Sequence, residues 1–138
     1  MIAYLDASVL LRILLGERRA LAEWRDLEQG VTSALAEVEV LRTLDRLRFA
    51  APSVDPGRLA RRREHAYRML EGLAIVELSR SVLARAAQPL PTALGTLDAI
   101  HLVSALSYRE AVEPLLFATH DEALGAAARA SGFEVIGC

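Results

Sequence analysis

Short, mostly apolar segments alternate along this 138-residue chain with longer segments of helical periodicity. Strands are predicted at residues 2–5, 31–33, 74–77, 115–118 and 134–136. Helices are predicted at residues 8–15, 19–28, 34–50, 56–71, 81–88, 97–109 and 122–130, with loops at 26–30 and 51–56. Strands that alternate with helices form a parallel sheet covered on both faces, and strands buried on both faces are apolar. The sequence therefore predicts one α/β domain over residues 1–138, a central parallel β-sheet flanked by helices on both faces.

The composition is that of a globular protein, with 53% hydrophobic and 25% charged residues. No apolar run reaches the roughly 18 residues that a membrane span needs, and the first residues lack the basic start and cleavage site of a signal peptide. Cys138 is the single cysteine, so no internal disulfide can form. These features predict a cytoplasmic protein without a membrane partner.

The net charge of −2 does not indicate bulk nucleic-acid binding, and all sixteen basic residues are arginine. Mechanisms that need a lysine, such as a P-loop or a Schiff base, are therefore excluded. Neither glycine-rich phosphate-binding motif follows the first predicted strand, where the chain reads Asp6-Ala7-Ser8. A carboxylate at this turn repels phosphate unless a cation lies between them.

Asp6 ends the first apolar segment and is the only charged side chain before Arg12. Burying a lone carboxylate costs roughly several kcal/mol, so Asp6 needs a cation, a nest of hydrogen bonds or water as a partner. The carboxyl ends of strands are also where open α/β sheets bind ligands. Asp6 is therefore a candidate site residue.

Asp98 stands in a similar apolar context, as the only acid or arginine between Arg85 and Arg109. Thr96 is expected to cap the helix that Asp98 begins, and the helix dipole alone would favour an acid there. His101 lies three residues on and shares a face with Asp98. His101 is either a satisfied core histidine or part of a site.

Asp121 follows the fourth predicted strand, at the same sheet edge as Asp6. It is a candidate site residue, although it can simply cap the alanine-rich helix that follows. His120 before it is expected to be a loop residue.

Glu37 and Glu39 lie on the helix predicted at residues 34–50, about 200° apart, so at most one can point into a shared site. Glu39 shares its stripe with Leu35, Arg42 and Arg46, and a local Glu39–Arg42 pair is the structural alternative. Because the helix is apolar nearly all round, periodicity does not choose between the two glutamates.

Carboxylates that converge at strand ends raise one another's pKa and require a counter-ion. A hard divalent ion held by oxygen ligands, Mg²⁺ or Mn²⁺, suits such a site. Zinc does not, because clustered Cys and His spacing is absent. A metal of this kind activates water and bridges to phosphate oxygens, so the expected chemistry is phosphodiester hydrolysis.

Four stretches resemble the PIN-domain family and, within it, the VapC-type toxins of bacterial toxin–antitoxin pairs. They are Tyr4-Leu5-Asp6-Ala7-Ser8, then Ser33-Ala34-Leu35 with Glu39 and Arg42, then Leu97-Asp98-Ala99-Ile100-His101-Leu102, and finally Thr119-His120-Asp121 with Gly132-Phe133-Glu134-Val135. Their order and spacing cover nearly the whole chain. The third stretch is the most specific.

The resemblance implies a Mg²⁺- or Mn²⁺-dependent endoribonuclease with a PIN-like three-layer sandwich. It implies an acidic quartet of Asp6, Glu39, Asp98 and Asp121, and it selects Glu39 over Glu37, whose role stays open. Asp6 and Asp98 would bind the metal directly, and Glu39 and Asp121 directly or through water. The resemblance further implies that Ser8 and Thr119 line the pocket, that a small antitoxin blocks the acidic cleft, and that the chain forms a homodimer.

A contact surface for RNA is predicted on the helix at residues 56–71, where Arg58, Arg61, His65 and Arg68 form one stripe. The alternative is an ordinary solvated helix face. The arginines at 12, 18 and 19 form a second candidate surface. Trp24 and Tyr67 either stack on bases or pack in a core or an interface.

Two other functions compete with the ribonuclease. A phosphatase with an aspartate nucleophile needs a second acid two residues after the first, where this chain has Ser8, and it needs a lysine, which is absent. A degenerate PIN-like module would bind RNA or protein without cutting, but all four acids are retained.

Overall fold

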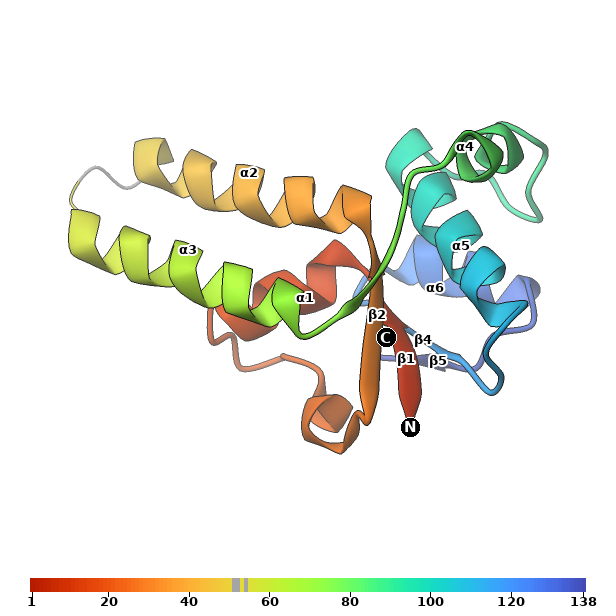
Figure 1. Cartoon of the computed structure of the whole chain (residues 1–138), viewed down its shortest axis with the longest axis horizontal. Coiled ribbons are helices and arrows are strands. Elements are labelled where there is room, and N and C mark those ends of the chain that lie inside the picture. The colour runs from red at the N-terminus through yellow and green to blue at the C-terminus, as the bar shows by residue number, and fades with distance from the viewer. Residues whose placement is uncertain (51–52, 54) are drawn as a thin grey trace.

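The computed structural model of the chain describes residues 1–50, 53 and 55–138 (Figure 1). Its centre is a parallel sheet in the order β3-β2-β1-β4-β5. The strands are β1 (Ile2–Leu5), β2 (Gln29–Ser33), β3 (Ala74–Val76), β4 (Leu116–Ala118) and β5 (Val135–Ile136). The predicted parallel α/β sheet is confirmed.

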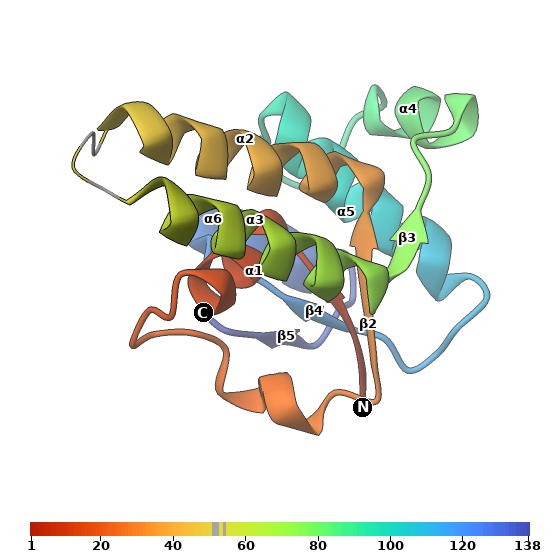
Figure 2. The same cartoon turned by 60° about the vertical axis from the view of Figure 1, so that its left-hand side comes forward.

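Helices cover both faces of the sheet (Figure 2). They are α1 (Ala7–Leu14), α2 (Ala34–Ala50), α3 (Pro56–Glu71), α4 (Arg80–Ala86), α5 (Thr96–Arg109) and α6 (Glu122–Ala130). Within the described residues, no helix is long and apolar enough to cross a membrane.

The side chains of β1 alternate between two cores, as the period of two in a strand requires. Ala3 and Leu5 pack in the core formed with α1, α2 and α3. Tyr4 points the other way and packs with Leu102 of α5 and Leu124 of α6. β1 is thus buried on both faces, which explains why it is apolar, and the layers agree with the predicted three-layer sandwich.

The strand order reverses between β1 and β4. From β1 the chain adds β2 and then β3 on one side, and it then crosses to build β4 and β5 on the other side. Leu5 of β1 pairs with Ala118 of β4, so Asp6 and Thr119 follow two adjacent strand ends. A reversal of strand order opens a crevice at the carboxyl ends of the strands, where α/β proteins bind ligands.

The helix predicted at residues 19–28 is wrong in length and type. The structure has a five-residue 3₁₀ helix, η1 (Ala22–Asp26). Leu21, Trp24 and Leu27 all pack against the core, and their spacing of three residues matches the three residues per turn of a 3₁₀ helix. Trp24 is partly buried and packs against the core.

Two predicted loops also change. β2 begins at Gln29, so the predicted loop at 26–30 is shorter than expected. In the loop predicted at 51–56, residues 51, 52 and 54 lie outside the described residues. Asp55 caps α3 by accepting a hydrogen bond from the Arg58 backbone N–H at 3.2 Å.

Candidate active site

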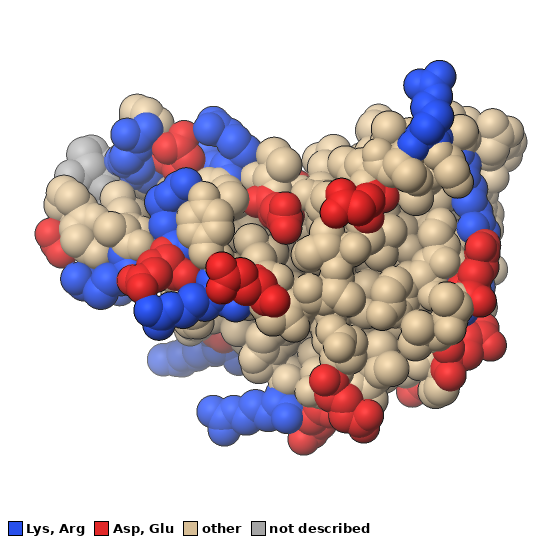
Figure 3. Space-filling view, in the orientation of Figure 1, with Lys and Arg blue, Asp and Glu red and all other residues tan. Residues whose placement is uncertain are grey.

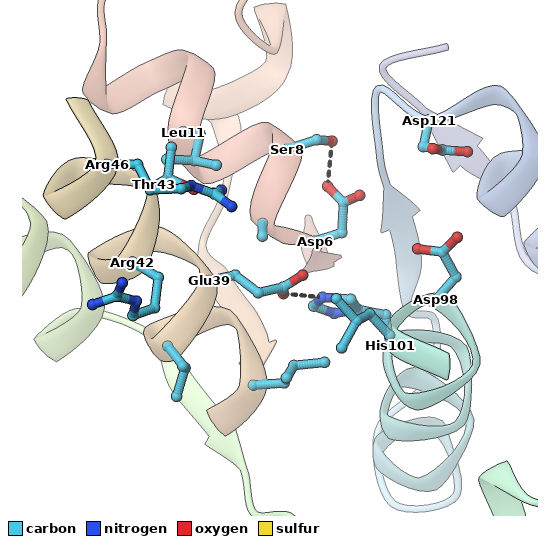
Figure 4. A pocket seen from close by; sticks show the side chains of 14 residues that line it. Asp6, Ser8, Leu11, Glu39, Arg42, Thr43, Arg46, Asp98, His101 and Asp121 are labelled. Carbon is cyan, nitrogen blue, oxygen red and sulfur yellow. Dashed lines mark hydrogen bonds and ion pairs between the residues drawn. The ribbon is translucent and has the colours of Figure 1, made fainter. Parts of the chain in front are cut away.

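A cavity of about 510 Å³ opens at the carboxyl edge of the sheet, between α1, α2, α5 and the start of α6. The outline of the molecule dips between α2 and α5 along the upper edge of Figure 3. Four carboxylates line the cavity, those of Asp6, Glu39, Asp98 and Asp121 (Figure 4). The structure thus brings all four predicted acids to one cavity.

Asp6 is almost fully buried, with 4% of its surface exposed. It is the N-cap of α1, and its Oδ1 accepts hydrogen bonds from the Val9 backbone N–H at 3.1 Å and the Ser8 hydroxyl at 2.6 Å. Its Oδ2 accepts from the Thr119 hydroxyl at 2.8 Å. A nest of hydrogen bonds therefore offsets the burial of this carboxylate, and that burial alone does not require a cation.

Ser8 lines the cavity as expected, whereas Thr119 is fully buried and is not among the lining residues. Hydrogen bonds of both hydroxyl groups link the end of β1 to the end of β4. The Thr119 hydroxyl donates to Asp6 and accepts from the Asp121 backbone N–H at 2.9 Å. The Ser8 hydroxyl accepts from the backbone N–H of the loop residue His120 at 3.0 Å. The two hydroxyl groups hold Asp6 in place and fix the turn that carries Asp121.

Asp98 lies in the first turn of α5 and is partly buried. Burial raises the pKa of Asp98, and the negative charges of Asp121, Asp6 and Glu39 raise it further, while His101 opposes them. The predicted cap is wrong: Thr96 is the first residue of α5, and Gly95 holds the N-cap position without a side-chain bond. The negative charges of the other three acids of the cavity therefore act on Asp98.

Asp121 has both of the roles considered from the sequence. Its Oδ1 accepts from the Leu124 backbone N–H at 2.9 Å and caps α6. It also lines the cavity and contributes to the negative field at Asp98. Capping fixes the direction in which the carboxylate points.

Glu39 pairs with His101 and not with Arg42. Its Oε2 lies 2.6 Å from His101 Nε2, whereas Arg42 pairs with Asp45 at 3.0 Å. The alternative of a local Glu39–Arg42 pair is thus wrong. Glu37 points elsewhere and lines a separate pocket between α2 and α3 with Tyr67 and Leu70.

His101 belongs to the core and to the cavity. It is 2% exposed, and its Nδ1 lies 2.9 Å from the hydroxyl of Tyr4, which is fully buried on β1. With Glu39 ionised, Nε2 donates to the carboxylate, and in a neutral ring Nδ1 accepts from Tyr4. The chain of contacts from Tyr4 through His101 to Glu39 fixes this acid. The sequence signal was a histidine three residues after Asp98 in an apolar helix.

The arginines predicted to contact RNA lie on α3, outside the residues that line the cavity. Arg68 pairs with Glu64 at 2.5 Å, and Arg61 lies 3.9 Å from Asp55. On the face seen in Figure 3, basic and acidic side chains intermingle over α2 and α3. Arg58 is exposed on the same helix. The arginines that line the cavity are instead Arg42 and Arg46 of α2.

The four carboxylates that line the cavity supply oxygen donors of the kind that a hard divalent cation prefers. Over residues 1–50, 53 and 55–138, however, no three His, Cys, Asp or Glu side chains are grouped closely enough to hold a metal ion as they stand. The four carboxylates thus line one cavity but are not arranged as a finished coordination shell.

Comparison with known proteins agrees with this fold and cavity. The PIN-domain family matches residues 3–130, and the chain belongs to this family, among relatives named as VapC ribonucleases. Ribonuclease VapC47 of Mycobacterium tuberculosis is 32% identical over 94% of this chain and 92% of its own length. Ribonuclease VapC46 of the same species is 35% identical over 96% and 95%.

Two solved structures share the fold at 20% identity. PAE2754 from Pyrobaculum aerophilum has a TM-score of 0.66 and covers 98% of this chain and 83% of its own. A chain of a toxin–antitoxin complex from Klebsiella pneumoniae has a TM-score of 0.59 and covers 86% of each chain. These likenesses support the α/β fold.

Proposed function

We propose that this protein is a Mg²⁺- or Mn²⁺-dependent endoribonuclease that hydrolyses RNA phosphodiester bonds. The observation that carries the proposal is the meeting of four carboxylates around one cavity where the strand order reverses. Burial raises the pKa of Asp98, and the negative charges of Asp121, Asp6 and Glu39 raise it further; a cation bound among these acids would offset that charge. Membership of the PIN-domain family and the two VapC ribonuclease relatives support RNA as the substrate.

Asp6 and Asp98 are the proposed direct ligands of the ion, and Glu39 and Asp121 bind it directly or through water. When bound, the ion would activate water and offset the charge of the phosphate. Ser8 and Thr119 orient Asp6 through hydrogen bonds of 2.6 and 2.8 Å. His101 uses Oε2 of Glu39 and leaves Oε1 for a ligand. Glu37 has no part in this proposal, because it lines another pocket.

We further propose that the ribonuclease is the toxin of a toxin–antitoxin pair, acts in the cytoplasm and forms a homodimer. The VapC names of the two relatives support an antitoxin as the protein partner, and so does the structural neighbour from Klebsiella pneumoniae, which belongs to a toxin–antitoxin complex. Co-expression with the product of an adjacent short reading frame tests this part. A toxin predicts growth arrest that the neighbouring product relieves, and growth unaffected by either protein contradicts it.

Cleavage of total RNA tests the enzyme. The wild-type chain should cut RNA with Mg²⁺ or Mn²⁺ and stop when EDTA is added. Asp6→Asn and Asp98→Asn should abolish cleavage, and Asp26→Asn, an exposed acid outside the cavity, should not. Cleavage by Asp98→Asn at the wild-type rate would refute the site. If calorimetry showed no metal binding and no RNA were cut, the chain would instead be a binding module.

A further inference from the structure

We propose that Arg46 forms a phosphate-binding subsite at the rim of the acidic cavity, where it holds a backbone phosphate of the RNA strand. This inference rests on RNA being the substrate, as proposed above. It assigns the contact with the nucleic-acid backbone to α2, next to the acids, and not to the arginine-rich α3.

The cavity has an acidic end and a basic end, and α2 contributes to both. Glu39, Arg42, Thr43 and Arg46 line the same cavity. Their spacing of three, four and seven residues places them on one face of the helix. At a rise of 1.5 Å per residue, Arg46 lies about 10 Å along the helix from Glu39. The two ends are thus neighbours on one continuous wall (Figure 4).

Arg42 and Arg46 differ in their ion-pair partners within the protein. Asp45 pairs with Arg42 at 3.0 Å and also with Arg48 at 3.0 Å. The Arg46 guanidinium donates through Nη2 to the Thr43 hydroxyl at 3.1 Å. Among the described residues, no carboxylate forms an ion pair with Arg46. Its charge and most of its donors remain for a ligand.

A phosphate suits this position for two reasons. The planar guanidinium presents several N–H groups in a fork that matches phosphate oxygens. An RNA strand that enters a cavity lined by four acids is repelled by them, so a cation on the same wall lowers the cost of bringing the polyanion in. The arginines of α3 do not reach this wall, since none of them lines the cavity.

Salt-dependent binding tests the subsite without any need for cleavage. The probe is a fluorescein-labelled single-stranded RNA, and its anisotropy is followed with Asp98→Asn protein in EDTA over a series of salt concentrations. Loss of one phosphate contact lowers the slope of log K against log salt by about 0.7 for a single strand. We expect this change for Arg46→Gln, with affinity several-fold weaker at low salt, and partial recovery for Arg46→Lys.

Two matched variants sharpen the result. Arg58→Gln, on the exposed stripe of α3, should leave both affinity and slope unchanged. Asp45→Asn should tighten binding, because it removes the carboxylate that pairs with Arg42. An Arg46→Gln protein with wild-type slope and affinity would overturn the subsite, as would an equal loss from Arg58→Gln or a probe that does not bind at all.

Cleavage by otherwise wild-type protein separates this inference from the proposed function. Arg46→Gln should raise KM several-fold and leave kcat nearly unchanged. If wild-type protein cuts no RNA with any metal while Arg46→Gln still changes the salt slope, the enzyme proposal fails and the subsite stands. If cleavage requires Asp98 while Arg46→Gln changes neither slope nor KM, the subsite alone fails.

Discussion

The contact between Tyr4 and His101 allows a quantitative test of how the acid Glu39 is held. Both residues are essentially buried, and the Tyr4 hydroxyl and His101 Nδ1 are 2.9 Å apart. Burial also raises the pKa of Tyr4 well above its usual value, so the hydroxyl keeps its proton. Tyr4→Phe leaves Nδ1 buried without its partner, and His101→Leu removes the hydrogen bond between the Tyr4 hydroxyl and the imidazole ring. A buried polar group without a partner costs about 1–3 kcal/mol.

The double variant Tyr4→Phe/His101→Leu removes both polar groups from the same place. Because an apolar pair of similar shape can be nearly neutral, the double variant should lose less stability than the two single variants together. We expect a coupling energy of at least about 0.5 kcal/mol. Glu39 adds little to the penalty, since 23% of its side chain is exposed and water can replace His101.

Urea unfolding of the wild type, the two single variants and the double variant measures this double-mutant cycle. An unchanged m-value shows that the unfolded state is not altered. The double variant should lose less free energy of unfolding than the sum of the losses of the two single variants. Strict additivity, or single variants as stable as wild type, would show that the contact does not hold the two groups together. Cleavage offers a second readout, in which His101→Leu should slow the reaction more than Tyr4→Phe, because only His101 contacts Glu39.

Three further perturbations have defined outcomes. The raised pKa means that folded Asp98 holds its proton more tightly than the unfolded chain does, so its contribution to stability falls as pH rises above about 4. Asp98→Asn should therefore raise Tm at pH 7, and this gain in Tm should vanish below a pH of about 4. An equal gain in Tm above and below that pH would contradict the raised pKa of Asp98. Thr119→Val removes the hydroxyl between Asp6 and Asp121 and should cost about 1–3 kcal/mol, whereas Thr119→Ser should lose only about 0.8 kcal/mol for a methyl group. Gly137 has φ +94°, and an added Cβ would meet the Thr119 carbonyl oxygen at 2.6 Å. Gly137→Ala should therefore lower the free energy of unfolding in urea by about 1–3 kcal/mol. An unchanged free energy of unfolding would contradict this close approach of Gly137 to Thr119.

The layers of the fold were predictable because burial on both faces leaves its mark on each strand. Tyr4 packs on one side of the sheet and Leu5 on the other, so β1 has to be apolar throughout. The mistaken helix at residues 19–28 has an equally physical origin. Leu21, Trp24 and Leu27 are spaced by three, which fits a 3₁₀ turn, but a short window does not separate that spacing from 3.6.

For the candidate site, the acids that line its cavity were predictable, and their hydrogen-bond partners were less so. Asp6, Asp98 and Asp121 stood out because each follows or interrupts an apolar segment. Periodicity did not choose between Glu37 and Glu39, because the choice depends on α5, which brings His101 to α2 across 62 residues. Ser8 and Val9 bind Asp6 locally, but its third hydrogen bond comes from Thr119, which lies 113 positions away. Contacts of this range follow from tertiary packing and leave no local pattern.

We propose that RNA is cut in the cavity between α2 and α5. Glu37 and Glu39 offer the most direct test, because they lie two positions apart on one helix and line different pockets. The measurement is the Mg²⁺-dependent rate of RNA cleavage by Glu37→Gln and Glu39→Gln. The proposed site predicts a loss of at least about tenfold for Glu39→Gln and an unchanged rate for Glu37→Gln. Equal rates for the two variants, or a loss confined to Glu37→Gln, would contradict it.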